Sequence, residues 1–241
     1  MNSKFNIVIP ARLESKRLHN KLLREVCGKP IIQWTWENSL SSNANSITVV
    51  TDSEEIKHII SELGGNVFLS KKEHESGTDR INEFISVNKV HDQELIINLQ
   101  GDEPLLDMDF IDKFARFMVN RKANFASMCK PFLYEENLDN PNRVKVAIDE
   151  QNKAILFSRK KIEGYDDSEN FHHIGVYGYD VNTLKKFASL PKSKNEIREN
   201  LEQLRALDNK IEIHMLKVQS FSSYGIDTED DLEKFKAHVT K

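Results

Sequence analysis

The sequence is poor in the residues that mark disulfide-rich, fibrous and low-complexity proteins. Of its 241 residues, two are cysteine, six are proline and nine are glycine. Cys27 and Cys129 lie far apart and do not have the spacing of a metal site or a disulfide framework. We therefore expect two reduced thiols, which is the usual state in the cytoplasm, and we expect the protein to be cytoplasmic.

Long apolar runs are also missing. No segment approaches the roughly 20 consecutive apolar residues that a membrane-spanning helix needs. The N-terminal apolar run is short and ends at Pro10, which is unlike a signal peptide. The net charge is −4, whereas general nucleic-acid-binding proteins are usually basic. We expect neither a membrane nor a nucleic acid as a partner.

What the sequence does contain is an alternation of short apolar runs with segments of helical period. Continuous short apolar runs are typical of strands buried on both faces of a parallel sheet. We therefore predict an α/β fold with a mostly parallel central sheet, as a single domain over residues 1–241. A smaller sub-region is expected after the irregular segment 130–145. The predicted strands are 5–9, 47–50, 67–69, 95–99, 144–148, 174–177 and 211–218, and the predicted helices are 31–40, 53–63, 79–87, 109–121 and 196–207.

The first predicted strand runs into a stretch crowded with cations, "IVIPARLESKRLHNK" (residues 7–21). Residues 1–30 carry seven Lys or Arg residues and two acidic residues, although the whole chain is acidic. A positive patch on such a protein suggests a compact anionic ligand, since Arg offers phosphate a planar fork and Lys a point charge. The stretch has neither a Walker pattern nor a GxGxxG pattern, so cationic side chains would have to do the binding. The alternative is a solvated basic loop.

Two further segments place carboxylates after apolar runs. In "LIINLQGDEP", Asp102 follows a strand at the sheet edge where ligands bind in such folds, and Mg²⁺ prefers carboxylates together with substrate phosphates. An ordinary polar turn explains the same residues. Asp227 precedes "TEDDLEKF", where Thr228 and Asp231 resemble a helix capping box. Asp227 gains a functional meaning only if it lies near Asp102.

Three other motifs have a functional and a structural interpretation. "SGTDR" places Ser76 and Arg80 at a helix start, a place suited to an anion or a base edge. "FHHIGVYGY" alternates like a strand, so His173, Gly175 and Tyr177 would share one face, although a histidine there can equally be a satisfied core residue. "ENLEQLRAL" places Glu202 and Gln203 beside a helical apolar pattern, although by itself the motif is typical of an ordinary amphipathic helix.

In combination, these motifs resemble those of the 3-deoxy-manno-octulosonate (Kdo) cytidylyltransferases, also called CMP-Kdo synthetases. "IPAR", "SGTDR", "NLQGDEP", "FSR" and "LEQLRAL" occur in the family's order, and the resemblance extends from Ile9 to Phe235. It implies a single-domain, Rossmann-like nucleotidyltransferase fold with a smaller sugar-binding and dimerisation sub-region. It also implies a homodimer that uses CTP, an ulosonic acid sugar and Mg²⁺ to make CMP-Kdo and pyrophosphate for lipopolysaccharide.

The resemblance implies roles for individual residues. The triphosphate would contact Arg12, Ser15, Arg17 and Lys21. The metal ligands would be Asp102 and Asp227. The cytidine pocket would contain Ser76 and Arg80, with Gln100 near the ribose or the sugar. The sugar side would be formed by Arg159, His173, Tyr177, Glu202 and Gln203, with Arg159 and either His173 or Gln203 on the sugar carboxylate.

The sequence departs from the family on the sugar side. "FSRKKIEGYDDSENFHH" lacks the Ile-Pro that follows "FSR" in many relatives, and Asp180 stands where a basic residue is common. With these departures, we expect the acceptor to be Kdo or a close analogue such as 8-amino-3,8-dideoxy-manno-octulosonate. The alternatives are a sialate-like ulosonic acid, or a silent homologue that binds the nucleotide without turnover.

Overall fold

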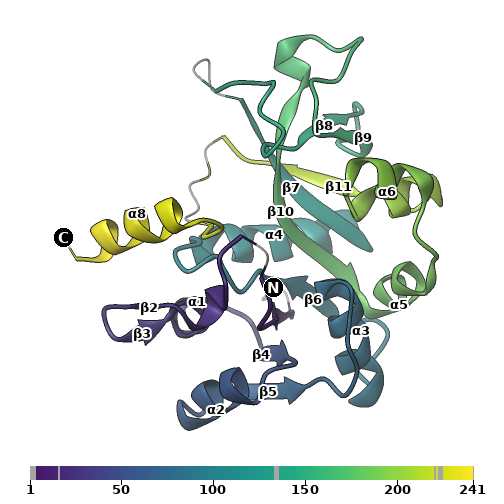
Figure 1. The fold of residues 1–241 in the computed structure, drawn as a ribbon. Helices are drawn as coiled ribbons and strands as arrows, with labels where there is room; N and C mark the ends of the chain where they lie inside the picture. Colours follow the sequence, from purple (N-terminus) through teal and green to yellow (C-terminus); the bar gives the residue numbers. More distant parts are fainter. Residues whose placement is uncertain (1–3, 16, 133–135, 220, 222–224, 241) are drawn as a thin grey trace. The chain divides into compact units, whose positions relative to one another are not determined.

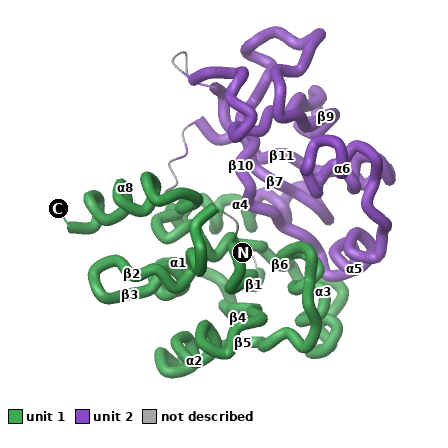
Figure 2. Tube along the Cα trace, in the orientation of Figure 1, with its two compact units in different colours: residues 1–115, 222–241 green, residues 116–221 purple. Residues whose placement is uncertain are grey.

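The computed structural model describes residues 4–15, 17–132, 136–219, 221 and 225–240. Lys16 of the cationic stretch lies outside these residues. The chain divides into two compact units (Figure 2): unit 1 comprises residues 1–115 and 222–241, and unit 2 comprises residues 116–221. The boundary falls within helix α4 (Met108–Arg121). That the whole chain forms one domain stays a prediction.

Unit 1 is built on a parallel sheet (Figure 1). Its strands are β1 (Asn6–Ala11), β4 (Ser46–Thr51), β5 (Asn66–Leu69) and β6 (Leu95–Asn98). In the described residues their order is β6-β1-β4-β5, and every pair is parallel. The centres of β1, β4 and β6 are fully buried, as the continuous apolar runs predict.

The helices of unit 1 begin close to where the sequence predicts. They are α1 (Ile31–Ser39), α2 (Glu54–Glu62), α3 (Gly77–Val87) and α8 (Glu229–Val239), with a short 3-10 helix η1 (Lys21–Leu23) and a small hairpin of β2 (Glu25–Val26) and β3 (Lys29–Pro30). Ser53, Ser76 and Thr228 each accept a hydrogen bond from an amide in the first turn of α2, α3 and α8. These caps satisfy amides that lack a partner within the helix, which explains the accurate starts.

Unit 2 is mainly antiparallel. Its strands are β7 (Phe125–Pro131), β8 (Lys145–Ile148), β9 (Ala154–Ser158), β10 (Phe171–Asp180) and β11 (His214–Lys217). Pairs β7–β10, β8–β10 and β8–β9 are antiparallel, and β7–β11 is parallel. The sequence reading did not predict β7, β9 or helix α5 (Val181–Ser189). The strand pairs of unit 1 are all parallel, as predicted, whereas unit 2 combines three antiparallel pairs with one parallel pair.

The predicted helix over residues 196–207 is wrong as one element. The chain forms α6 (Lys194–Glu199) and α7 (Gln203–Asp208), and Asn200 lies between them with a left-handed φ of 52°. Asparagine tolerates this conformation better than most residues, so it ends α6 at low cost. The short 3-10 helix η2 (Asp167–Glu169) completes the unit. Across the described ranges, no helix combines the length and the apolar character that crossing a membrane requires.

Candidate functional site

The loops that follow β1, β4 and β6 lie at one edge of the sheet of unit 1. Ala11 is paired with Thr51, so β1 and β4 end together, and β6 ends at Asn98 opposite Val8, three residues before the end of β1. The approach is close at Gly101, where an added Cβ would lie 3.2 Å from the Pro10 carbonyl oxygen. A larger residue would push the first and third loops apart.

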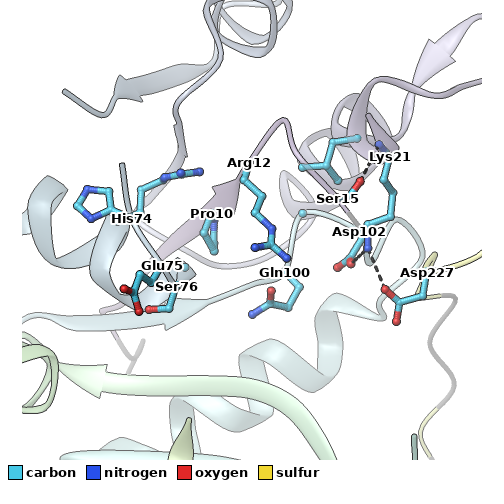
Figure 3. Close-up of a pocket in the computed structure, with 14 residues that line it drawn as sticks. Pro10, Arg12, Ser15, Lys21, His74, Glu75, Ser76, Gln100, Asp102 and Asp227 are labelled. Atoms are coloured by element: carbon cyan, nitrogen blue, oxygen red, sulfur yellow. Dashed lines mark hydrogen bonds and ion pairs between the residues drawn. The ribbon is translucent and has the colours of Figure 1, made fainter. Parts of the chain in front are cut away.

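A pocket of about 280 Å³ opens at this edge (Figure 3). It contains most of the residues that the sequence assigned to the nucleotide. Its lining residues are Pro10, Arg12, Ser15, Lys21, Leu22, His74, Glu75, Ser76, Gly77, Arg80, Gln100, Gly101, Asp102 and Asp227.

Asp52, directly after β4, holds the cationic loop in place. Its Oδ1 accepts a hydrogen bond of 3.1 Å from the Leu13 amide, and its Oδ2 pairs with the Arg80 guanidinium. Arg80 is 3% exposed and also donates a 2.9 Å hydrogen bond to the Ala11 carbonyl oxygen. The predicted cytidine-pocket residue Arg80 therefore also ties α3 to the end of β1.

Ser15 shapes the cationic loop from within. Its hydroxyl donates to the Leu18 carbonyl and accepts a 3.2 Å hydrogen bond from the Lys21 amide. Ser15 thus orients the turn that presents Lys21, besides lining the pocket as predicted.

Lys21 brings the two predicted metal ligands together. Its ammonium group donates to Asp102 Oδ2 and to Asp227 Oδ1, the latter at 3.0 Å. The second carboxylate oxygen of Asp227 pairs with Arg17 at 2.8 Å. Burial alone would lower the pKa of Lys21, but the two carboxylates, Asp102 before Asp227, outweigh it and raise that pKa.

The chemistry of this cluster fits a hard divalent cation. Asp102 and Asp227 already share one cation, the Lys21 ammonium, and carboxylate oxygens are ligands that Mg²⁺ prefers. Within the described part of the chain, no group of three or more His, Cys, Asp or Glu side chains could hold a metal. A cation here would complete its shell with water and substrate phosphates, which is usual for Mg²⁺.

Of the other predicted CTP-binding residues, three line the pocket and one lies outside its lining. Figure 3 shows the Arg12 side chain extending toward Gln100, which itself lines the pocket. Ser76 caps α3, since its hydroxyl accepts a 3.1 Å hydrogen bond from the Asp79 amide. Arg17 is not in the pocket lining and reaches the cluster through its pair with Asp227.

Three lining residues were not singled out from the sequence: Leu22, His74 and Glu75. His74 and Glu75 directly precede the "SGTDR" motif, and that proximity was the available signal. His74 Nε2 lies 2.7 Å from Glu83 Oε2. Burial acts to raise the pKa of Glu83, but this contact and the Lys71 amide hold it below its usual value.

Apart from Gln100, which lines the pocket of unit 1, the predicted sugar residues lie in unit 2, and three of them form one cluster. The rings of His173 and Tyr177 have centroids 5.6 Å apart. The Tyr177 hydroxyl donates to Gln203 Oε1 at 3.1 Å. Gln203 is 3% exposed, and its Nε2 has no hydrogen-bond partner among the described residues. A buried amide donor without a partner is costly, which is a reason to expect that a ligand oxygen satisfies it.

Burial sets the protonation of this cluster. It lowers the pKa of His173 to about 3, with a smaller contribution from His172, so the imidazole is neutral at neutral pH. Burial also raises the pKa of Tyr177, and the nearby charge of Glu202 acts in the same direction. The tyrosine therefore remains a hydroxyl donor.

Arg159 and Glu202 are engaged elsewhere in unit 2. The Arg159 guanidinium donates to the main-chain carbonyls of Glu199, Asn200 and Pro141, at 2.7, 3.1 and 3.1 Å. A guanidinium has five N–H donors, so these bonds leave two. Its role at the sugar carboxylate stays a prediction. Glu202 Oε1 lies 3.3 Å from Arg205 Nη2.

The unusual Asp180 has a local structural role. Its Oδ1 accepts a 2.6 Å hydrogen bond from the Thr183 amide and caps α5. Aspartate is among the best residues for this position. The departure from the family pattern therefore needs no change of ligand to explain it.

Comparison with known proteins gives consistent matches over the chain. The family model described as Cytidylyltransferase matches residues 6–213. A protein named 3-deoxy-manno-octulosonate cytidylyltransferase from Francisella tularensis subsp. novicida (strain U112) is 40% identical over 241 residues, covering 96% of each chain. A protein of the same name from Ruthia magnifica is 34% identical, covering 98% of this chain and 99% of the other.

Comparison with solved structures agrees with these sequence matches. A structure of CMP:2-keto-3-deoxy-manno-octonic acid synthetase complexed with CTP matches with a TM-score of 0.89 and 34% identity, covering 99% of both chains. This match confirms the predicted α/β nucleotidyltransferase fold. A cytidylyltransferase structure from Leptospira borgpetersenii has a TM-score of 0.66 and 17% identity, covering 98% of this chain and 87% of the other, and shares the fold alone.

Proposed function

Because this chain belongs to the cytidylyltransferase family, we propose that it transfers CMP from CTP to the anomeric hydroxyl of Kdo and releases pyrophosphate. The relatives named for this activity cover nearly the whole chain. The observation that carries the proposal is the position of Lys21 between Asp102 and Asp227 in a pocket that Arg12 also lines. Cations and carboxylates side by side suit a polyphosphate that arrives with its own counter-cation.

The reaction is an in-line displacement at phosphorus. The oxygen of the sugar hydroxyl attacks the α-phosphorus of CTP. The new oxygen–phosphorus bond forms as the bond between the α-phosphorus and pyrophosphate breaks, and the hydroxyl proton is released. Negative charge grows on the phosphoryl oxygens and on the leaving group. Arg12, Arg17 and Lys21 stabilise that charge, and positioning of the two substrates supplies much of the remaining acceleration.

We further propose that Asp102 and Asp227 hold Mg²⁺. When bound, the metal supplies charge neutralisation and can lower the pKa of an oxygen that it binds. With the metal bound, Lys21 would be available to the triphosphate instead of the carboxylates.

Three further properties belong to this proposal: a homodimer, a cytoplasmic location, and a role in lipopolysaccharide synthesis. The dimer is supported by β9, which pairs with β8 alone in the strand order of the described chain. Ile155 and Leu156 on β9 are 49% and 38% exposed, and an apolar edge strand favours burial by a partner. Sedimentation of the purified protein and of Ile155→Lys would test the dimer.

The test of function is pyrophosphate release with CTP, Mg²⁺ and a panel of acceptors. Turnover with Kdo is the expected result. Turnover with 8-amino-3,8-dideoxy-manno-octulosonate but not with Kdo would move the acceptor to the analogue, and turnover with a sialate alone would overturn the assignment. CTP binding without any pyrophosphate release would identify a silent homologue.

Asp102→Asn is the matching variant, with Asp109→Asn as its control. The first removes a charge from the proposed metal ligands, so turnover should fall by about 10²- to 10³-fold, as for other groups that stabilise transition-state charge. Asp109 is exposed on α4 and does not line the pocket, so its variant should retain full turnover. Full activity in Asp102→Asn would refute the metal assignment.

A further inference from the structure

Strand β10 is interrupted between Ile174 and Tyr177. Against β7, Ile174 is paired with Met128 and Tyr177 with Ser127, so three steps along β10 match one step along β7. Gly175 and Val176 form a bulge. The regular alternation predicted for His173, Gly175 and Tyr177 is therefore wrong at this point, because the bulge removes Gly175 from the ladder.

The bulge brings His173 and Tyr177 together. In a regular strand these residues would be about 13 Å apart, at about 3.3 Å per residue. In the structure their partners are Cys129 and Ser127, only two residues apart, and the ring centroids are separated by 5.6 Å. Two side chains four positions apart in sequence become neighbours on one face.

A single hydroxyl closes the bulge. Ser127 is fully buried, and its Oγ lies 3.1 Å from the Ile174 carbonyl and 2.8 Å from the Val176 carbonyl. The same Oγ lies 2.8 Å from His173 Nε2. The hydroxyl thus contacts both ends of the bulge and the imidazole.

This arrangement fixes the tautomer of His173. The Ser127 hydroxyl has one hydrogen, and the two carbonyls can only accept. If Nε2 also accepted, the single hydrogen would have to serve three acceptors, whereas donation by Nε2–H leaves only the two carbonyls to share it. The consistent assignment has the hydroxyl donating to the carbonyls and His173 Nε2–H donating to Ser127 Oγ. The neutral ring then keeps its lone pair on Nδ1.

We propose that Ser127 is a positioning residue for the acidic sugar: it closes the β10 bulge, sets His173 beside Tyr177, and makes His173 Nδ1 a hydrogen-bond acceptor. This inference rests on the proposed function, since it assigns His173 and Tyr177 to the sugar. An acceptor nitrogen suits a sugar hydroxyl and repels a carboxylate. His173 Nδ1 therefore accepts a hydrogen bond from a sugar hydroxyl. The sugar carboxylate is bound by donors such as Gln203 Nε2, which has no partner among the described residues.

The kinetic test compares Ser127→Ala with Ser127→Thr. Alanine removes the hydroxyl, so KM for Kdo should rise about tenfold or more while KM for CTP and kcat stay within about twofold. Threonine keeps the hydroxyl at a strand position where β-branched residues fit, and it should restore KM. Ser39→Ala is the control, because Ser39 is also fully buried and donates to a carbonyl, that of Trp36, within unit 1.

The spectroscopic test uses ¹⁵N-histidine NMR of the full chain without substrates. Wild type should show a protonated Nε2 and an unprotonated Nδ1 for His173, and Ser127→Ala should lose this single-tautomer signature. An unprotonated Nε2 in wild type would overturn the proposal, as would an unchanged KM for Kdo in Ser127→Ala. If wild type does not turn over Kdo, the proposed function fails, yet the NMR result still decides whether Ser127 sets the tautomer.

Discussion

Lys21 Nζ lies 3.0 Å from Asp227 Oδ1, although 206 residues separate the two in the sequence. The same ammonium contacts Asp102, and the Lys21 side chain is only 12% exposed. One ammonium group therefore bridges two carboxylates, and Arg17 supplies a second cation to Asp227. In the proposed function the triphosphate also binds Lys21, so it would compete with the two carboxylates for this ammonium group.

Lys21→Met should weaken nucleotide binding. Loss of a charge-assisted contact to phosphate costs about 1.5–3 kcal/mol, which raises KM for CTP by about tenfold to a hundredfold. In the substrate-free protein, the two carboxylates lose a shared partner, so the melting temperature should fall and should recover as Mg²⁺ is added. Calorimetry and CTP titrations measure both effects. Lys29→Met is the control, because Lys29 pairs with Glu37 outside the pocket; an equal rise of KM in both variants would contradict the assignment.

Ser76 and Ser53 offer a matched pair of helix caps. Ser76 Oγ accepts from the Asp79 amide at 3.1 Å, and Ser53 Oγ accepts from the Ile56 amide at 3.2 Å. Replacing either with alanine should cost about 1 kcal/mol of unfolding free energy, because an amide loses its partner. Only Ser76 lines the pocket, so only Ser76→Ala should raise KM for CTP. Equal KM values in the two variants would limit Ser76 to a structural role.

His173 should make the protein less stable as the pH falls below about 6.5. Burial lowers its pKa from 6.5 to about 3 in the folded state, so between these values the unfolded chain binds a proton that the folded chain does not. The stabilisation is complete above pH 6.5 and is lost progressively down to pH 3. The slope is at most about 1.4 kcal/mol per pH unit.

Urea unfolding of wild type and His173→Asn between pH 7 and 5 measures this slope. The variant should lose the contribution of His173 and keep that of His172, whose pKa burial lowers to about 4. Identical slopes in the two proteins would show that His173 is not buried in its neutral form.

Glu196 should be among the most sensitive positions of unit 2. Its carboxylate accepts two hydrogen bonds from the Arg205 guanidinium, at 2.8 and 2.7 Å, and both side chains are less than 10% exposed. Glu196→Ala leaves a buried charge without this partner and should cost about 3–5 kcal/mol. Asp230→Ala breaks the exposed pair with Lys234, which water and salt screen, and should cost far less. Chemical denaturation of both variants provides the comparison, and similar losses would argue against the buried pair.

The sequence by itself determined the features that depend on neighbouring residues. Strands β1, β4 and β6 could be predicted from their apolar runs, because both faces of a parallel sheet are buried. The starts of α2 and α8 could be predicted because the side chains of Ser53 and Thr228 accept hydrogen bonds from amides only three residues away. The motif order also indicated the family, since the loops after these strands carry its cationic and acidic residues.

The tertiary structure alone decided which distant residues meet. Asp102 and Asp227 come from different loops, and only the folded chain places Lys21 between them. Likewise, Gly175 is compatible with a bulge in β10, but the size and place of the bulge depend on pairing with β7, where the hydroxyl of Ser127 contacts the Ile174 and Val176 carbonyls. Local hydrogen bonds leave a signature in sequence spacing, whereas pairings across the chain depend on the geometry that all the elements build together.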